Sequence, residues 1–154
     1  MKSLAEVVAE SPVFAGMAKE HLELLAGCAQ NVHFADGRTI VREGEPADVF
    51  YLVRHGAVAL DTFVPGRGPV TIETVHEGDL VGWSWLFPPY RWHFDARAIG
   101  SVAAVSVDGA CMRGKCAADH DFGYELMLRI SQVMLDRLQA TRLRLLDVYG
   151  HVPR

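Results

Sequence analysis

The segment of residues 78–98 holds the densest group of side chains that could form a binding site. It reads GDLVGWSWLFPPYRWHFDARA and contains all three tryptophans of the chain, Trp83, Trp85 and Trp92. Aromatic walls with a few placed polar or charged groups are typical of ligand pockets, and Arg91 lies among these rings. The segment therefore predicts a lined pocket or a contact patch, although any single ring could equally belong to the hydrophobic core.

Two cysteines and a histidine form a second candidate group. Four residues separate Cys111 from Cys116, and three separate Cys116 from His120. Thiolate and imidazole groups are ligands that zinc prefers, but structural zinc sites use more closely spaced pairs, so a metal site is the minor alternative. We expect instead that the three cysteines, an odd number that includes Cys28, are free thiols in a reducing compartment. A redox role for Cys111 and Cys116 is a further alternative.

The sequence contains no convincing catalytic motif. Cys116, Asp119 and His120 could supply a nucleophile, an acid and a base, but nothing in the sequence predicts an oxyanion hole beside them. Ser84 lies in GWSW rather than in a G-x-S-x-G elbow, and there is no glycine-rich phosphate loop with a lysine. We therefore expect that the protein is not an enzyme.

Short apolar runs separated by glycines must form the frame that positions these side chains. Between residues 31 and 107 they recur about every ten residues, a spacing typical of a sandwich, jelly roll or barrel. Glycines supply the positive φ that tight turns between strands require. We expect a mainly β fold, a jelly-roll β-barrel of about eight strands, with short N-terminal helices and a long C-terminal helix.

Helices are expected on both sides of this β-roll. Ser3 and Glu6 have the spacing of a capping box, and the helix that they begin should end near Ser11–Pro12, because the residue before a proline leaves the helical region. Further helices are expected over residues 19–29, 110–117 and 120–149.

The last of these helices carries two apolar rows. One follows the alternating spacing of a coiled-coil seam and consists of Met127, Ser131, Met134, Leu138, Thr141, Leu145 and Val148. The other consists of Leu128, Leu135, Leu146 and Tyr149. Because one stripe suffices to cover a core, two stripes indicate a helix that also forms a homodimer; packing of both rows inside the monomer is the alternative. The remaining faces carry arginines that we expect to be solvated, namely Arg129, Arg137, Arg142 and Arg144.

The composition fits a single domain over residues 1–154. Half of the residues are hydrophobic, and 15 Lys and Arg against 19 Asp and Glu give a formal net charge of −4. This length allows a sizeable core, and the charge does not favour nucleic acid, whose binders usually carry a basic stripe. The sequence has neither a signal peptide nor an uninterrupted apolar stretch of about 18 residues, so we expect a cytoplasmic protein without membrane contact.

The order of these parts resembles the cyclic-nucleotide-binding domain of the catabolite-activator (Crp/Fnr-like) superfamily, over roughly residues 4–149. Four local marks carry the resemblance: SPVFAGM at residues 11–17, the hairpin of residues 37–44, FYLV followed by Gly56-Ala57-Val58, and GDLVG at residues 78–82. Each mark is weak by itself, but their order and spacing are fairly specific.

The resemblance implies a phosphate-binding cassette after residues 78–82. In that family a short helix presents N–H groups to the cyclic phosphate, an arginine pairs with it, and a glutamate accepts a hydrogen bond from the ribose hydroxyl. Here Trp83 stands at the glutamate position, Trp85 at that of a small residue, and Arg91 one place out of the arginine register. Since tryptophan cannot accept that hydrogen bond, we expect a retained roll with an altered cassette.

We therefore expect a regulatory module that binds a small effector between the β-roll and the long helix. The expected site residues are Gly82, Trp83, Ser84, Trp85, Arg91 and Trp92. The effector would be a cyclic nucleotide, cAMP or cGMP, or another small anionic molecule, with Arg91 as the partner of its anionic group.

This module would signal to a partner protein and would not bind DNA directly. The family's transcription factors continue into a helix-turn-helix, whereas only four residues follow Gly150 here. One alternative is a ligand-free interaction or scaffold domain in which Trp83 and Trp85 fill the pocket. The other is a metal or redox sensor built on Cys111, Cys116 and His120.

Overall fold

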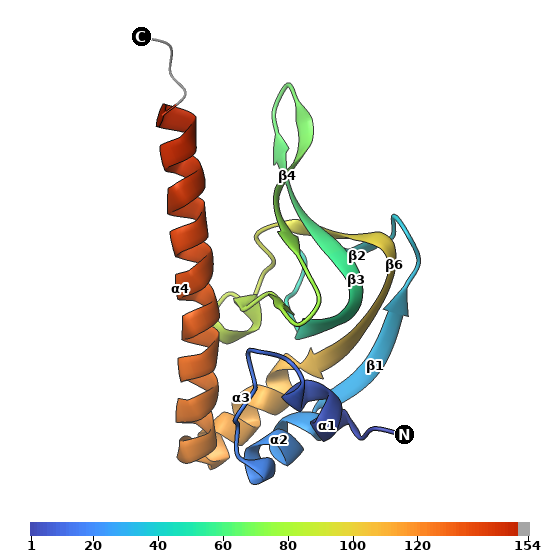
Figure 1. Cartoon of the computed structure of the whole chain (residues 1–154), viewed down its shortest axis with the longest axis vertical. Coiled ribbons are helices and arrows are strands. Elements are labelled where there is room, and N and C mark those ends of the chain that lie inside the picture. The colour runs from blue at the N-terminus through green and yellow to red at the C-terminus, as the bar shows by residue number, and fades with distance from the viewer. Residues whose placement is uncertain (151–154) are drawn as a thin grey trace.

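The computed structural model describes residues 1–150 and consists of a curved β-roll beside one long helix (Figure 1). In chain order the elements are α1 (Leu4–Ala9), α2 (Lys19–Ala26), β1 (Ala29–Phe34), β2 (Thr39–Val41), β3 (Val49–Val64), β4 (Gly68–Val75), β5 (Leu80–Val81), the 3₁₀ helix η1 (Ser84–Leu86), β6 (Asp95–Asp108), α3 (Gly109–Ala118) and α4 (His120–Gly150). Residues 151–154 lie outside the described residues. The expectation that no helix-turn-helix follows α4 depends on these residues.

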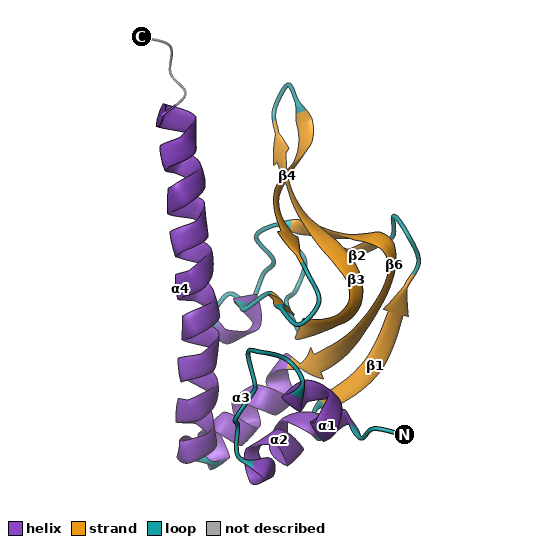
Figure 2. Ribbon diagram, viewed as in Figure 1, coloured by secondary structure: helices purple, strands orange, loops and turns teal. Residues whose placement is uncertain are grey.

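The strands form one antiparallel sheet, which confirms the expected β-roll with flanking helices. Four strands follow the order β1-β6-β3-β4, while β2 also pairs with β6 and β5 with β3. Figure 2 shows the short helices α1, α2 and α3 together at one end of this roll, next to the first half of α4. The β3–β4 hairpin extends along the second half of α4 (Figure 1).

Residues 1–150 form six strands rather than the expected eight, because two pairs of predicted strands are continuous. β3 passes through Gly56 and β6 through Gly100, both with positive φ. A Cβ at Gly56 would lie 2.5 Å from the carbonyl oxygen of Ser101 on the paired strand. Glycine therefore lets the strand bend here, with a shift of register but with β3 and β6 paired on both sides of the bend, whereas in sequence it looks like a turn between two strands.

The buried side chains form two clusters. One fills the roll and includes Val41, Leu60 and Trp92. The other joins the roll to the helices and includes Phe50, Trp85 and residues of α4. The aromatic segment of residues 78–98 thus contributes to both clusters, which is why it lies at the centre of the fold.

The expected helices are confirmed, with one correction. The Ser3 side chain accepts a hydrogen bond from the backbone N–H of Glu6 at 3.2 Å, as the capping box predicts. α3 and α4 agree with their predicted bounds to within one residue at either end. α2, however, ends at Ala26, because Ala29 already pairs with Val107 of β6.

α4 buries a row of residues that differs from both predicted apolar rows. The core-facing residues are Phe122, Leu126, Ile130 and Val133. Of the two predicted rows, only Met127 and Met134 are partly buried, and the remaining members are exposed. The alternative that both rows pack within the monomer is therefore excluded for this chain. No helix within residues 1–150 is long and apolar enough to cross a bilayer.

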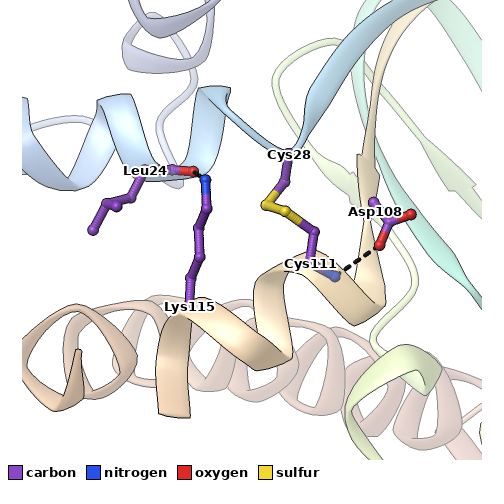
Figure 3. Close-up of a disulfide and its surroundings, with 5 residues drawn as sticks. All are labelled: Leu24, Cys28, Asp108, Cys111 and Lys115. Atoms are coloured by element: carbon purple, nitrogen blue, oxygen red, sulfur yellow. Dashed lines mark hydrogen bonds between the residues drawn. A yellow bond between two sulfur atoms is a disulfide. The ribbon is translucent and has the colours of Figure 1, made fainter. Parts of the chain in front are cut away.

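The expectation of three free thiols is wrong, because Cys28 and Cys111 form a disulfide (Figure 3). These residues are 83 positions apart in sequence, but their Cα atoms lie 5.8 Å apart. The pairing of β1 with β6 brings the residue before β1 next to the first turn of α3. Cys116 is the free cysteine. An odd cysteine count gives no indication of such a long-range approach.

Candidate ligand-binding site

Trp92 occupies the inside of the roll. Its side chain is buried, with 3% exposure, and its ring packs at a tilt on Phe94 with 5.7 Å between ring centres. Gly82 has a φ of +91°, and a Cβ there would lie 2.7 Å from Cη2 of Trp92. Glycine at position 82 is thus required both by its backbone conformation and by the ring that lies against it.

Trp85 belongs to the second cluster, between the roll and the helices. It is fully buried and stacks on Phe50 with 5.1 Å between ring centres. Its neighbour Ser84 is also buried. The indole N–H of Trp85 has no hydrogen-bond partner among the described residues, while its backbone carbonyl accepts from Arg113 Nη1 at 2.6 Å. Trp85 therefore fixes η1 to the core of the domain.

Trp83 instead faces α4. It is half-buried at the start of η1, and the Arg137 guanidinium lies 5.0 Å from its ring centre. Arg137 also pairs with Glu73 of β4 at 3.2 Å and donates to the carbonyl of Leu80. Burial lowers the pKa of Arg137 from its ordinary value, while the carboxylates of Glu73 and Asp79 oppose that shift. One side chain of α4 thereby contacts Trp83 and the sheet together.

Arg91 lies on the outside of the roll. Its side chain is exposed, and its Nη1 donates to the carbonyl of Gly44 at 3.3 Å. Arg97 also lies away from the interior, where it pairs with Asp61 at 3.2 Å. The structure therefore does not bring the expected site residues together. Trp92 lies inside the roll, Trp85 lies in the core next to the helices, and Trp83 faces α4.

A groove of about 370 Å³ runs between the roll and α4. Its lining comes from the N-terminal loop, from the roll and from α4, namely Pro12, Val13, Glu73, Asp79, Arg129, Gln132, Val133, Asp136, Arg137 and Ala140. Arg129 and Arg137 are largely buried, with 21% and 14% exposure, and both donate to backbone carbonyls. The expectation that they are solvated is wrong for these two arginines.

The buried row of α4 is the sequence signal that could have identified Arg137. It follows Val133 by four residues and Ile130 by seven, and both of these face the core. Residues at these spacings share one face of a helix. An arginine that continues an apolar row is therefore a candidate for an inward-facing cation. Glu73 and Asp79 carry no comparable signal, because only the pairing of the strands brings them to α4.

The proposed zinc ligands do not converge. Cys111 is bonded to Cys28, and within residues 1–150 there is no group of three or more His, Cys, Asp and Glu residues that could hold a metal ion. Burial and the nearby Asp119 carboxylate raise the pKa of the Cys116 thiol. Cys116 is therefore a weaker nucleophile at neutral pH than an ordinary cysteine.

Comparison with known protein families agrees with the architecture of the roll. Residues 31–119 match the family described as the cyclic nucleotide-binding domain. The chain belongs to this family. The match covers most of the roll together with α3, and so includes the Gly82–Trp92 contact and the segment around η1.

Two relatives of this cyclic nucleotide-binding domain have names that describe regulatory proteins. The CRP-like cAMP-activated global transcriptional regulator of Mycobacterium tuberculosis is 28% identical over 149 residues, which are 96% of this chain and 65% of that protein. The cAMP-dependent protein kinase regulatory subunit of Dictyostelium discoideum is 31% identical over 54% of this chain and 27% of its own length. The chain thus spans just under two thirds of the bacterial regulator.

A solved structure shares the fold over nine tenths of this chain. The putative cyclic nucleotide-binding protein from Geobacter metallireducens is 29% identical, with a TM-score of 0.77, over 90% of this chain and 99% of its own. The arrangement of roll and long helix in this cyclic nucleotide-binding domain is therefore common to both. Within this fold Trp83 faces α4 and Trp92 fills the roll.

Proposed function

We propose that this chain is a regulatory module that binds a small anionic effector between the roll and α4 and passes the signal through α4 to a partner protein. The observation that carries the proposal is the position of Arg137. Its guanidinium, 14% exposed, lies between the Trp83 ring and the Glu73 carboxylate at the edge of the groove. A cation at that place can bind an anion that enters from the groove.

The chemistry of the groove supports an effector with a negative and a flat part. An anionic group would compete with Glu73 for the two-pronged guanidinium of Arg137. Trp83 lies behind Arg137 rather than in the lining of the groove, so a base could stack on its ring if the guanidinium moved aside. We propose cAMP and cGMP as the first candidates, because the bacterial relative is named as cAMP-activated. In this arrangement Arg137 takes the part that the sequence suggested for Arg91.

Dimerisation through α4 is the second part of the proposal. The second half of α4 exposes a dense set of large apolar side chains, namely Leu138, Leu143, Leu145, Leu146, Val148 and Tyr149. Burial of that surface against a second copy would stabilise the dimer by about 25 cal/mol for each Å² of apolar surface that is removed from water. A pair of α4 helices would also give a partner protein a single surface that moves when the groove is occupied. We propose no catalytic step.

A specific observation favours the alternative of a ligand-free interaction domain. Trp92 closes the roll from within and lies against Gly82, so an effector cannot enter the roll unless this ring moves. The sequence suggested Trp83 and Trp85 for such self-filling, whereas Trp92 is the ring inside the roll. Under this alternative the module would act only through its surfaces, and no nucleotide would change its stability.

Thermal unfolding with cAMP, cGMP and AMP distinguishes the two functions. A ligand at 100 times its Kd stabilises the folded state by about 2.7 kcal/mol, which raises the Tm of a domain of this size by roughly 5–10 °C. We expect such a shift with one cyclic nucleotide and none with AMP. Arg137→Gln should abolish the shift, whereas Arg142→Gln, at an exposed position of the same helix, should keep it. No shift with either cyclic nucleotide would favour the ligand-free domain.

A further inference from the structure

The Cys28–Cys111 disulfide lies at the joint between the roll and the helices. Cys28 directly precedes β1, and Cys111 lies in the first turn of α3 (Figure 3). The backbone N–H of Asp108 donates to the carbonyl of Cys28 at 2.9 Å, and the Asp108 side chain caps α3 by accepting from the N–H of Cys111 at 2.7 Å. These hydrogen bonds hold the two segments together independently of the sulfur atoms, so the bond can open and close again.

The disulfide is accessible from solvent. A cavity of about 390 Å³ is lined by both cysteines together with Gln30, Ser106 and Asp108, and both cysteines are partly exposed. Structural disulfides resist reduction, whereas exposed ones are the labile or regulatory ones. A thiol of small size can approach the sulfur atoms through this cavity.

We propose that Cys28–Cys111 is a reversible modification site whose reaction partner is a dithiol. A thiolate of the dithiol attacks Sγ of Cys28, and the S–S bond breaks with its electron pair on Sγ of Cys111. Cys111 lies in the first turn of α3, where the helix dipole favours its thiolate and the Asp108 carboxylate that caps the helix opposes it. The second thiol of the dithiol then displaces Cys28. The protein gains two electrons and two protons as two thiols, and the dithiol becomes a disulfide.

The state of the bond changes how firmly α3 is attached to the rest of the domain. Without it, α3 is held to the N-terminal helices by the packing of Met112 in the shared core and by the Lys115 ammonium group, which donates to the carbonyl of Leu24 at 2.6 Å (Figure 3). α3 also holds η1, because Arg113 donates to Trp85 and lies 4.3 Å from the ring centre of Tyr90. Reduction should therefore loosen α3 and, through Arg113, residues 84–90.

The test uses the full chain in buffers that range from oxidised to reduced dithiothreitol. Thiol titration without denaturant should count one thiol in the oxidised protein, three after reduction, and one again after reoxidation. Hydrogen exchange should be faster by about tenfold in residues 84–90 and 109–118 of the reduced protein, and unchanged in β3. This inference does not depend on an effector, since neither measurement contains one.

Two variants control the experiment. Cys116→Ser should count no thiol when oxidised and two when reduced, with the same difference in hydrogen exchange. The double variant Cys28→Ser/Cys111→Ser should show the exchange pattern of the reduced protein in every buffer. A disulfide that is reduced only after denaturation would overturn the proposal, as would identical hydrogen exchange of α3 in the two states.

Discussion

The guanidinium of Arg137 lies 5.0 Å from the ring centre of Trp83, which joins the middle of α4 to the segment that follows β5. The same guanidinium pairs with Glu73 of β4 at 3.2 Å. Because these contacts come from one side chain, α4 cannot move away from the roll without breaking both. An effector that binds Arg137 would therefore act directly on the attachment of α4.

Replacement of this arginine should destabilise the domain. Arg137→Gln removes the contact with Trp83 and leaves Glu73 without its partner. We expect a loss of about 1–3 kcal/mol in the free energy of unfolding, measured by urea denaturation. Arg142→Gln changes the same residue type at an exposed position of α4 and should change stability by less than about 0.5 kcal/mol. Equal effects of the two variants would contradict the role given to Arg137.

The contact between Gly82 and Trp92 predicts a large effect from a single methyl group. Gly82→Ala places a Cβ 2.7 Å from Cη2 of Trp92 at a φ of +91°. We expect a destabilisation of about 2–4 kcal/mol, from overpacking and from the backbone conformation together. Gly66→Ala is the matched control, because Gly66 also has a positive φ but has no atom within 4 Å of the added Cβ. Gly66→Ala should lower the free energy of unfolding by about 1 kcal/mol.

Loss of the disulfide should lower the Tm even where the fold persists. For a closed loop of about 83 residues, the chain-entropy model gives a contribution of about 4.5 kcal/mol. Reduction, or the variant Cys28→Ser/Cys111→Ser, should thus lower the Tm by roughly 9–18 °C in differential scanning calorimetry. Cys116→Ser should leave the Tm of the oxidised protein close to that of the wild type, because Cys116 takes no part in the bond.

Charges on the exposed row of α4 should separate the proposed dimer. Leu145 and Leu146 are 54% and 65% exposed, so Leu145→Glu/Leu146→Glu should convert a dimer to a monomer without loss of secondary structure. Light scattering after size-exclusion chromatography measures the mass, and circular dichroism measures the helix content. Phe63→Glu, at an equally exposed apolar position on β3, should remain dimeric. A monomeric wild-type protein would rule out the proposed dimer.

The order and type of the elements could be predicted from local signals. Glycine-separated apolar runs predicted the roll, the spacing of Ser3 and Glu6 predicted the start of α1, and continuous helical periodicity predicted α4. These signals depend on backbone conformation and on neighbouring residues, which the sequence contains directly. The strand count was wrong at Gly56 and Gly100, because a glycine that ends a strand and one that bends it have the same sequence signal.

The directions of the three tryptophans could not be predicted in this way. Trp83, Trp85 and Trp92 lie within ten residues of one another, yet they face α4, the helical core and the interior of the roll. Their directions depend on the backbone path around η1 and on which partner each ring meets, and those partners come from distant segments.

What the sequence by itself determined was therefore the family and the β-roll with its flanking helices. Only the tertiary structure decided that Arg137 rather than Arg91 meets Trp83, and that Cys28 meets Cys111. The physical reason is the same in both cases. Local patterns report on residues a few positions apart, whereas strand pairing and helix packing bring together side chains that are more than fifty positions apart.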